Sequence, residues 1–255
     1  MRLLVLGLLG VLGGCNFRHG ELCSTCDDAP TGSNPDALPI DTPVDMAIDA
    51  PKGSAAPFCD PADTTLAGCW EFEGNTNDGT GHGMSATNTG ATYVTGRTGM
   101  AVHIDANTAL DVTENVAMDV TSLTIEAWIH AAIPASGRSG ILDNNNQYGF
   151  FIYAGPFFRC IGFDQNVTLV ANTWTHVACT YDGTVRVYVD GVKVGENGGG
   201  GGALSTAATT GLTLGDDNPA GGGDALLGDL DQVRLYNVAR TPTQICQDAG
   251  LSICP

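Results

Sequence analysis

The sequence predicts an all-β domain, a two-sheet antiparallel sandwich of the jelly-roll type with one short helix near its C-terminus. Three observations lead to this prediction. Roughly a dozen short β-prone runs follow one another after residue 57, with turn residues every 8–12 residues or so, a spacing typical of sandwiches and jelly rolls. Two Asp-Gly pairs join alternating runs as hairpins. A capping box near the C-terminus predicts the single helix.

The N-terminal residues 1–14 have the order of charges and apolar residues expected of a secretory signal peptide. Met1-Arg2 supplies a positive charge, and the apolar run Leu3–Leu12 is shorter than the roughly 20 residues that span a bilayer as a helix. The stretch Leu12-Gly13-Gly14-Cys15 resembles the bacterial lipobox. The resemblance implies that Cys15 is acylated, and Asn16 after it favours the outer membrane or cell surface. The alternative is a secretory peptide in which Cys15 is accidental.

Residues 15–56 lack hydrophobic periodicity, and prolines and aspartates recur along them. Proline fixes φ, and repeated carboxylates repel one another, so this segment cannot bury enough apolar surface to fold. We expect a disordered spacer that holds a domain of residues 57–255 away from the membrane; a docking motif is the alternative. The formal net charge of −18 argues against binding to nucleic acid or to anionic membranes, which leaves the lipid as the membrane contact.

The predicted strands lie in short runs rich in β-branched and aromatic residues. Ser122–Ala131 is the clearest of the early runs, because Leu123, Ile125, Ala127 and Ile129 alternate with more polar residues. The runs outside the hairpin region are Trp70–Phe72, Ala91–Val94, Met100–Ile104, Ser122–Ala131, Tyr148–Tyr153, Phe157–Phe163, Thr210–Leu214 and Leu226–Tyr236.

The segment Thr173–Gly195 predicts a three-stranded meander. Asp182-Gly183 and Asp190-Gly191 each separate two alternating runs. Asp-Gly is a preferred pair for the tight turns that match the twist of a hairpin. The five glycines Gly198–Gly202 that follow cannot pack as a core strand, so we expect a surface loop there.

The one predicted helix begins at the sequence Thr241-Pro242-Thr243-Gln244. Thr241 and Gln244 have the spacing of a capping box, and Pro242 stands at the first helical position, where its missing N–H is not needed. Gly250 is placed to end the helix.

The chain has nine cysteines, which leaves eight if Cys15 carries lipid. An even number of cysteines in an exported protein suggests disulfides, although eight cysteines allow 105 connectivities. We predict that neighbours in the sequence pair with each other. The predicted pairs are Cys23–Cys26, Cys59–Cys69, Cys160–Cys179 and Cys246–Cys254. Metal binding by Cys23 and Cys26 is the alternative, but no second Cys/His pair stands at zinc spacing.

Four blocks of the sequence resemble the laminin-G-like, concanavalin A-like jelly-roll domains of bacterial surface proteins. They are CWEFEGNTNDGTGHG (69–83), SLTIEAWIHA (122–131), NTWTHVACTYDGTVRVYVDGVKVG (172–195) and LLGDLDQVRLYNVARTPTQI (226–245). The blocks stand in the family's order and span almost the whole domain. The departures are Thr80 for serine, His82 for asparagine and Thr241-Pro242 for Leu-Ser, and none of them threatens the fold.

The aromatic residues have two expected roles. We expect at least two of Trp128, Trp174 and Tyr181 in the core between the sheets, where large rings contribute most to packing. Sugars are bound in many jelly rolls by aromatic rings, and the candidates for such contacts are Tyr148, Tyr153, Phe157 and Phe158. We expect most of these four in the core as well.

The resemblance implies a structural calcium ion held by Asp78 and Asp231, with Glu73 as a third ligand. Calcium takes six to eight oxygens, and acids from distant segments can converge on it. The alternative is that Asp78 forms an Asx turn and that Asp231 pairs with Arg97 or Arg234. A second group of acids, Asp216, Asp217, Asp224 and Asp229, lacks EF-hand spacing, so we expect a solvated loop there.

No catalytic motif stands out in the chain. Jelly-roll glycosidases place two carboxylates on one strand face, whereas the strand Ser122–Ala131 offers Glu126 alone. The scattered histidines, His176 among them, do not form a zinc motif. We therefore predict a non-catalytic binding or adhesion module, lipid-anchored outside the cell, that recognises a glycan or a protein partner. The alternative is a glycoside hydrolase or lyase on the same fold.

Overall fold

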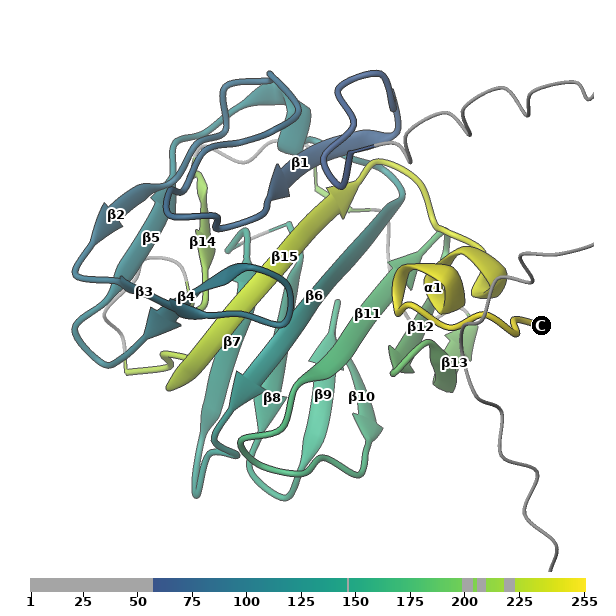
Figure 1. Ribbon diagram of the computed structural model, residues 1–255. Coiled ribbons are helices and arrows are strands. Elements are labelled where there is room, and N and C mark those ends of the chain that lie inside the picture. Colours follow the sequence, from purple (N-terminus) through teal and green to yellow (C-terminus); the bar gives the residue numbers. More distant parts are fainter. Residues whose placement is uncertain (1–56, 146, 199–203, 206–209, 218–222) are drawn as a thin grey trace, which may run out of the picture. The chain divides into compact units, whose positions relative to one another are not determined.

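The computed structural model describes residues 57–145, 147–198, 204–205, 210–217 and 223–255. The predicted signal peptide, Cys15, the spacer and the predicted pair Cys23–Cys26 lie outside these residues, as does most of the glycine run 198–202. The described residues form two antiparallel β-sheets packed face to face, with sheet A in front of sheet B in Figure 1. Nowhere in this part of the chain does a helix have the length and apolar character needed to cross a membrane.

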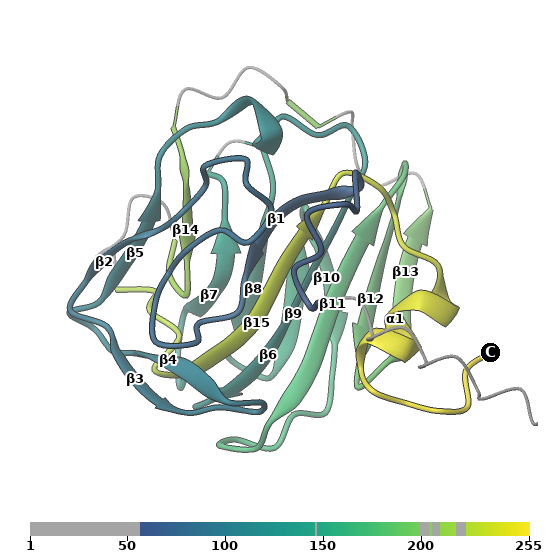
Figure 2. The ribbon, with the colours of Figure 1, turned by 45° about the horizontal axis from the view of Figure 1, so that its top comes forward.

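Sheet A has the strand order β13-β12-β11-β6-β15-β4-β3, and β1 also pairs with β15. Its strands are β1 (Leu66–Trp70), β3 (Thr92–Thr95), β4 (Met100–Ile104), β6 (Leu123–Ala131), β11 (Thr175–Tyr181), β12 (Thr184–Val189), β13 (Val192–Gly198) and β15 (Gly228–Tyr236). The central strand β15 changes its neighbour along its length, because Gly228–Leu230 pair with β4 and Val233–Tyr236 pair with β1. Figure 2 shows β1 and β4 on the same side of β15.

Sheet B has the strand order β10-β9-β8-β7-β14-β5-β2. Its strands are β2 (Thr87–Thr89), β5 (Ala109–Val112), β7 (Arg138–Asp143), β8 (Gly149–Tyr153), β9 (Phe157–Cys160), β10 (Phe163–Asn166) and β14 (Leu212–Leu214). A short 3-10 helix, η1 (Val116–Met118), follows β5, and the α-helix α1 (Pro242–Asp248) follows β15. The predicted all-β sandwich with one C-terminal helix is confirmed.

The core fills the space between the sheets and is apolar. Phe150 and Phe158 of sheet B and Trp70 of sheet A are fully buried in it. The expectation that at least two of Trp128, Trp174 and Tyr181 lie in the core is wrong. Tyr181 belongs to the core, but Trp128 and Trp174 are half-buried on the outer face of sheet A. Trp128 alternates along β6 with the apolar residues, so its side chain points to the outer face together with the polar residues of the strand.

The predicted meander and helix are confirmed. Strands β11, β12 and β13 pair in sequence order, with the two Asp-Gly pairs between them. Asp190, Gly183 and Gly191 adopt positive φ, as tight hairpin turns require. At α1 the Thr241 side chain accepts from the Gln244 N–H, and the Gln244 side chain accepts from the Thr241 N–H, so the capping box is complete.

Several strand boundaries differ from the prediction. The first strand ends at Trp70 instead of beginning there, because Phe72 takes a φ of 60° and turns its ring into the core. The predicted run Phe157–Phe163 is divided into β9 and β10 by a tight turn at Ile161 and Gly162. Strands β2, β5 and β7 were not predicted, since they are short or rich in Gly and polar residues.

Three of the predicted disulfides are confirmed: Cys59–Cys69, Cys160–Cys179 and Cys246–Cys254. Cys160 lies on β9 of sheet B and Cys179 on β11 of sheet A, so their disulfide links the two layers. The other two tie the segment before β1 to that strand and the C-terminal residues to α1. Such cross-links form in oxidising compartments and agree with an extracellular domain.

Candidate functional site

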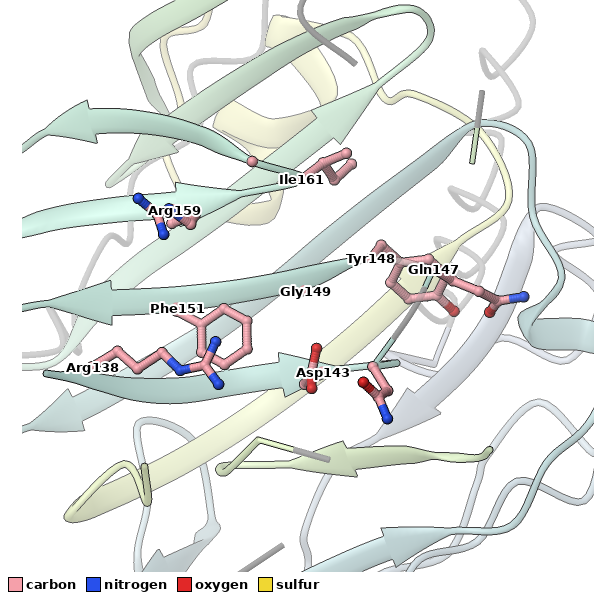
Figure 3. A pocket seen from close by; sticks show the side chains of 10 residues that line it. Arg138, Asp143, Gln147, Tyr148, Gly149, Phe151, Arg159 and Ile161 are labelled. Atoms are coloured by element: carbon pink, nitrogen blue, oxygen red, sulfur yellow. The ribbon is translucent and has the colours of Figure 1, made fainter. Parts of the chain in front are cut away.

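The outer face of sheet B carries a pocket of about 310 Å³, which we call the sheet-B pocket. Strands β7, β8 and β9, the β7–β8 loop and the β9–β10 turn supply its walls, as Figure 3 shows. The lining residues are Arg138, Asp143, Asn145, Gln147, Tyr148, Gly149, Phe151, Arg159, Ile161 and Gly162. Strand alternation explains this set: Phe150 and Ile152 enter the core, so Phe151 between them faces outward.

The guanidinium of Arg138 lies over the ring of Phe151. Its Cζ atom is 4.3 Å from the ring centroid, and Figure 3 shows the guanidinium beside the ring on the neighbouring strand. Arg138 donates from Nε to Asp224 (2.5 Å) and from Nη2 to Asp217 (3.2 Å). These bonds hold the guanidinium in place, so this part of the pocket floor presents a fixed polar group beside an aromatic ring.

Arg159 repeats this arrangement on β9. Its Cζ atom lies 4.6 Å from the centroid of the Tyr153 ring, and Nη1 donates to the Tyr153 hydroxyl at 3.1 Å. Two further bonds run to the carboxylate of Asp164, at 2.5 and 2.7 Å. Tyr153 also stacks on Phe157, with 4.8 Å between centroids. Two arginine–aromatic pairs therefore lie on either side of β8 on one sheet face, and of the second pair Arg159 lines the pocket while Tyr153 supports it.

Gly149 at the start of β8 keeps the pocket open. A Cβ atom built on this glycine would lie 2.5 Å from Cε2 of Phe151 and 2.6 Å from Oδ1 of Asp143. Both distances are shorter than real contacts, so a larger residue would displace the ring or the carboxylate. The glycine lets Phe151 and Asp143 approach the same spot from two strands.

The turns that close the pocket contain strained backbone. Ile161, in the β9–β10 turn, has a φ of 48°, which β-branched residues rarely adopt, and Asn145 in the β7–β8 loop has a φ of 35°. The same loop is fixed by polar contacts: Asn144 donates to Gln147, Gln147 donates to Asp119 at 2.5 Å, and the Tyr148 hydroxyl donates to the Met118 carbonyl at 3.0 Å. Such strain is often found where a fold positions a ligand site.

The sequence drew attention to only part of this pocket. Of the four candidate aromatics, Phe158 and Tyr148 are core residues, and Tyr153 and Phe157 are half-buried at the surface. Arg138, Arg159 and Gln147 were missed. The residues of Phe157–Cys160 point alternately inward and outward, so Arg159 points to the side of the sheet away from the buried Phe158. That alternation could have indicated an outward arginine.

The three predicted calcium ligands do not gather in one place. Asp78 accepts from Thr80 N–H and hydroxyl and from the Met84 N–H, so it forms a turn within its own loop. Asp231 accepts from the N–H groups of Arg97 and Thr98 at 2.8 and 3.2 Å. Among the described residues, no group of three or more His, Cys, Asp or Glu side chains is arranged to hold a metal ion.

Glu73 and Asp231 do approach each other around the β3–β4 turn. Glu73 accepts from the Met100 N–H at 3.1 Å, and its carboxylate lies against Gly99 of the same turn. Burial raises the pKa of Asp231, and the negative charge of Glu73 adds to this rise. The N–H groups of Arg97 and Thr98 lower the pKa, but by less, so it lies at about 6. Asp231 Oδ1 is buried and has no hydrogen-bond partner among the described groups.

Glu126, the carboxylate weighed as catalytic, lies beneath the outer face of sheet A with its side chain 1% exposed. Arg234 Nη2 is 2.6 Å from its Oε1 and 3.3 Å from Asp248 Oδ1, so one guanidinium joins the two acids. Burial raises the pKa of Glu126 to about 7 although Arg234 lowers it. His176, 3.8 Å away, is also buried, and burial lowers its pKa to about 3. Glu126 is not among the residues that line the sheet-B pocket.

The second group of acids is more ordered than a solvated loop. Asp217 and Asp224 hold Arg138, and Asp216 is 2% exposed. Asp229 lies on the opposite sheet, where its two oxygens bind His103 Nδ1 at 2.6 Å and His130 Nδ1 at 2.9 Å. These acids therefore position basic side chains.

Comparisons with solved structures find domains of the same fold in other proteins. Domain 4 of AbnA, an extracellular arabinanase from Geobacillus stearothermophilus solved with arabinotriose, is 19% identical, with a TM-score of 0.63 over 72% of this chain and 98% of that one. The binding domain of Paraclostridial Mosquitocidal Protein 1 is 16% identical (TM-score 0.59; 72% and 52% covered). Trypanosoma rangeli sialidase is 16% identical, with a TM-score of 0.54, and the match spans 72% of this chain but only 32% of the sialidase. At these identities the likeness shows the fold alone.

Sequence comparison gives the family. None of the curated proteins matches the chain. Residues 103–246 match a laminin-G family model, and they run from β4 through the capping box into α1. This match covers more than half of the chain and agrees with the jelly-roll topology. The chain therefore belongs to the concanavalin A-like lectin/glucanases superfamily.

Proposed function

We propose that this domain binds a glycan, without cleaving it, in the sheet-B pocket. The observation that carries the proposal is the pair of guanidinium groups fixed over aromatic rings on one sheet face, Arg138 on Phe151 and Arg159 on Tyr153. A sugar ring presents apolar C–H groups beside hydroxyls. A floor that offers flat apolar edges beside fixed N–H donors complements both.

The end of the pocket supplies the remaining hydrogen-bonding groups. Asp143 and Asn145 line it next to Gly149, and Gln147 is engaged with Asn144 and Asp119, so it holds the loop in place. Carboxylate and amide oxygens accept from sugar hydroxyls, and amide N–H groups donate to them. A few fixed polar groups around a rigid floor are typical of small-molecule sites. A protein partner is the other ligand class that the sequence leaves open, but a pocket of this size fits one or two sugar units better than a protein surface.

The structural neighbours support a glycan as the ligand class. The arabinanase domain was solved with arabinotriose, and the sialidase acts on sugars by its name. The same neighbours also include enzymes, so the hydrolase or lyase reading needs its own test. Glycoside hydrolysis requires two carboxyl groups facing one bond, roughly 5 to 9.5 Å apart. The pair Glu126 and Asp248 is closed by Arg234 and buried, which is why we propose binding alone.

We also propose that the domain is exported and held at the outer membrane or cell surface by lipid on Cys15. The order of charge, apolar run and Leu12-Gly13-Gly14-Cys15 supports this. The three disulfides support an oxidising compartment. The spacer of residues 15–56 would then set the reach of the binding domain.

A structural calcium ion stays part of the proposal. The residues that support it are Glu73 and Asp231, because the fold brings them to one turn and leaves Asp231 Oδ1 buried without a hydrogen bond. Asp78 is engaged in its own loop and would not contribute. Loop carbonyl groups and water would have to complete the coordination.

The test is a glycan array probed with the full chain, followed by calorimetry with each oligosaccharide that binds and with arabinotriose. Arg159→Ala should reduce the affinity, whereas Arg186→Ala on β12, an arginine that also pairs with an aspartate, should not. Polysaccharides incubated with the chain should release no reducing ends. Turnover, or binding that Arg159→Ala leaves unchanged, would contradict the proposal.

A further inference from the structure

A second cavity lies on the outer face of sheet A, and we call it the sheet-A cavity. Its volume is about 420 Å³, and it is bounded by the segment that precedes β1, by β15 and by α1. Its walls include Phe58, Gln232, Arg234, Tyr236, Arg240 and Gln247. We infer that this cavity is a second ligand site, which takes one unit of a neutral saccharide. It shares no lining residue with the sheet-B pocket, so the inference goes beyond the function proposed above.

The wall of the cavity is rigid. Arg234 Cζ lies 4.2 Å from the centroid of the Phe58 ring and 5.7 Å from that of the Tyr236 ring. Arg240 Cζ lies 4.3 Å from the centroid of the same Tyr236 ring. The Arg234 side chain is only 10% exposed and pairs with Glu126 beneath it. A wall in which rings and guanidinium groups alternate loses little conformational entropy when a ligand binds.

The charges of the wall are already compensated. Arg240 donates from Nε to Asp248 at 2.8 Å, its Nη2 lies 2.6 Å from the same carboxylate, and Arg234 Nη2 lies 3.3 Å from it. Asp60 and Asp63 also line the cavity, so two guanidinium groups face three carboxylates, a net charge of −1. The whole chain carries −18. A carboxylated or sulfated glycan would meet repulsion here and would find no unpaired arginine.

The groups that remain for a ligand both donate and accept. The side-chain amides of Gln232 and Gln247 line the cavity and make no hydrogen bond with any residue the structure describes. Asp60 and Asp63 use one oxygen each for the turns of their own segment, where Oδ1 accepts from Ala62 N–H and from Thr65 N–H. Amides and carboxylate oxygens at close quarters complement hydroxyl groups, which donate and accept at once.

The backbone at Gln232 is strained in the way that ligand sites often are. Gln232 has a φ of 51°, in the bulge where β15 exchanges β4 for β1 as its neighbour. A non-glycine residue in this region costs free energy, and the surrounding structure must hold it there. The bulge turns Gln232 into the wall of the cavity instead of continuing the alternation of the strand.

Two saccharide sites on opposite sheets would let one domain hold two chains, or two parts of one chain, at the same time. Linked sites of this kind raise the overall affinity without any new contact at either site. A domain on a membrane tether could use them to bind a fibrous or layered polysaccharide.

The experiment follows the side-chain amide signals of the full, isotope-labelled chain by NMR. The probes are three neutral trisaccharides, arabinotriose, cellotriose and maltotriose, and the anionic trigalacturonic acid, each at about 10 mM so that millimolar affinities are visible. We expect at least one neutral probe to shift the amides of Gln232 and Gln247, and trigalacturonic acid not to shift them. Gln232→Ala and Gln247→Ala should each weaken that binding about fivefold, the scale of one lost neutral hydrogen bond.

Two control variants separate this site from the sheet-B pocket. Gln165→Ala on β10 is the matched control and should leave the affinity unchanged. Arg159→Ala weakens binding in the sheet-B pocket, so shifts of Gln232 and Gln247 that keep their full size in this variant belong to the sheet-A cavity. The inference is overturned if none of the neutral probes moves these amides, if only trigalacturonic acid does, or if the glutamine variants bind as the parent does. If Arg159→Ala abolishes binding while the two glutamine variants bind as the parent does, the sheet-B proposal stands and this inference is refuted.

Discussion

Arg234 Nη2 lies 2.6 Å from Glu126 Oε1, in a contact where the glutamate side chain is 1% exposed and the arginine 10% exposed. Glu126 comes from β6 and Arg234 from the neighbouring strand β15, where the two residues are direct partners in the register. Arg234 also contacts Asp248 of α1, so its guanidinium joins the sheet to the C-terminal helix. A buried pair of this kind makes stability depend on pH.

The first prediction concerns that dependence. Burial raises the pKa of Glu126 from its ordinary value of 4.5 to about 7. Between these two pH values the folded state holds a proton on Glu126 that the unfolded state has released. This stabilisation is complete below the pKa of the unfolded chain and is lost as the pH rises through 7. The free energy of unfolding should therefore fall by up to about 3 kcal/mol between pH 5 and pH 8. Urea unfolding of the parent and of Glu126→Gln at both pH values measures it, and an equal fall in both proteins would rule out Glu126 as the cause.

The second prediction concerns the disulfide between the sheets. Cys160 and Cys179 are 19 residues apart, and closing a loop of this length restricts the unfolded chain by about 3 kcal/mol. The double variant Cys160→Ala/Cys179→Ala should lose at least about 3 kcal/mol of stability, because the cavity left by the two sulfurs adds to the entropic term. Guanidinium unfolding provides the measurement. A loss below about 1 kcal/mol would mean that packing alone holds the layers together.

The third prediction separates charge from shape in the sheet-B pocket. Arg138→Ala should weaken glycan binding by at least about tenfold, since hydrogen bonds from charged groups are the stronger ones. Arg138→Lys keeps the charge but loses the flat group over Phe151 and the two directed bonds to Asp217 and Asp224, so it should not restore binding. Calorimetry with a glycan identified on the array decides the matter, with thermal unfolding to confirm that each variant folds. Full affinity in the lysine variant would show that the charge suffices.

The fourth prediction tests the calcium proposal. Excess Ca²⁺ over EDTA should raise the melting temperature of the parent, because an ion that binds only the folded state stabilises it. Glu73→Gln and Asp231→Asn should each abolish the increase. Asp78→Asn should change stability through its turn but keep the response to calcium, since Asp78 accepts from Thr80 and Met84 instead. An unchanged melting temperature in the parent would end the proposal.

The fifth prediction concerns the N-terminus. The parent, expressed in a Gram-negative host, should partition into detergent, and its first mature residue should be Cys15 carrying acyl chains, since two or more chains anchor a protein stably. Cys15→Ser should leave the protein in the aqueous phase. Mass spectrometry of the mature N-terminus is the measurement, and an unmodified first residue in the parent would refute the lipid anchor.

The pattern of residues determined much of the fold in advance. Local chemistry is sufficient for Asp182-Gly183, Asp190-Gly191 and the Thr241–Gln244 capping box, because each depends on residues within a few positions of each other. The three disulfide pairs could be predicted for the same reason: neighbours in sequence are held near each other whatever the topology. Strands β2, β5 and β7 lack such local signals and exist because their neighbours in the sheet complete their hydrogen bonds.

The candidate sites depend on contacts that no local pattern contains. Arg138 is 86 residues from Asp224, and Asp231 is 134 residues from Arg97, so only the packed sheets bring their groups within hydrogen-bonding distance. The outward direction of Trp128 could be read from the alternation of β6, but not that it remains half-buried at the surface of sheet A. The sequence by itself determined the sandwich through the spacing of its strands and turns, and it determined the hairpin turns, the helix and the nearby cross-links through interactions between close residues. Which side chains meet over Phe151, and which carboxylates are buried beside Arg234, was decided by tertiary structure alone, because sheet order and register set those distances.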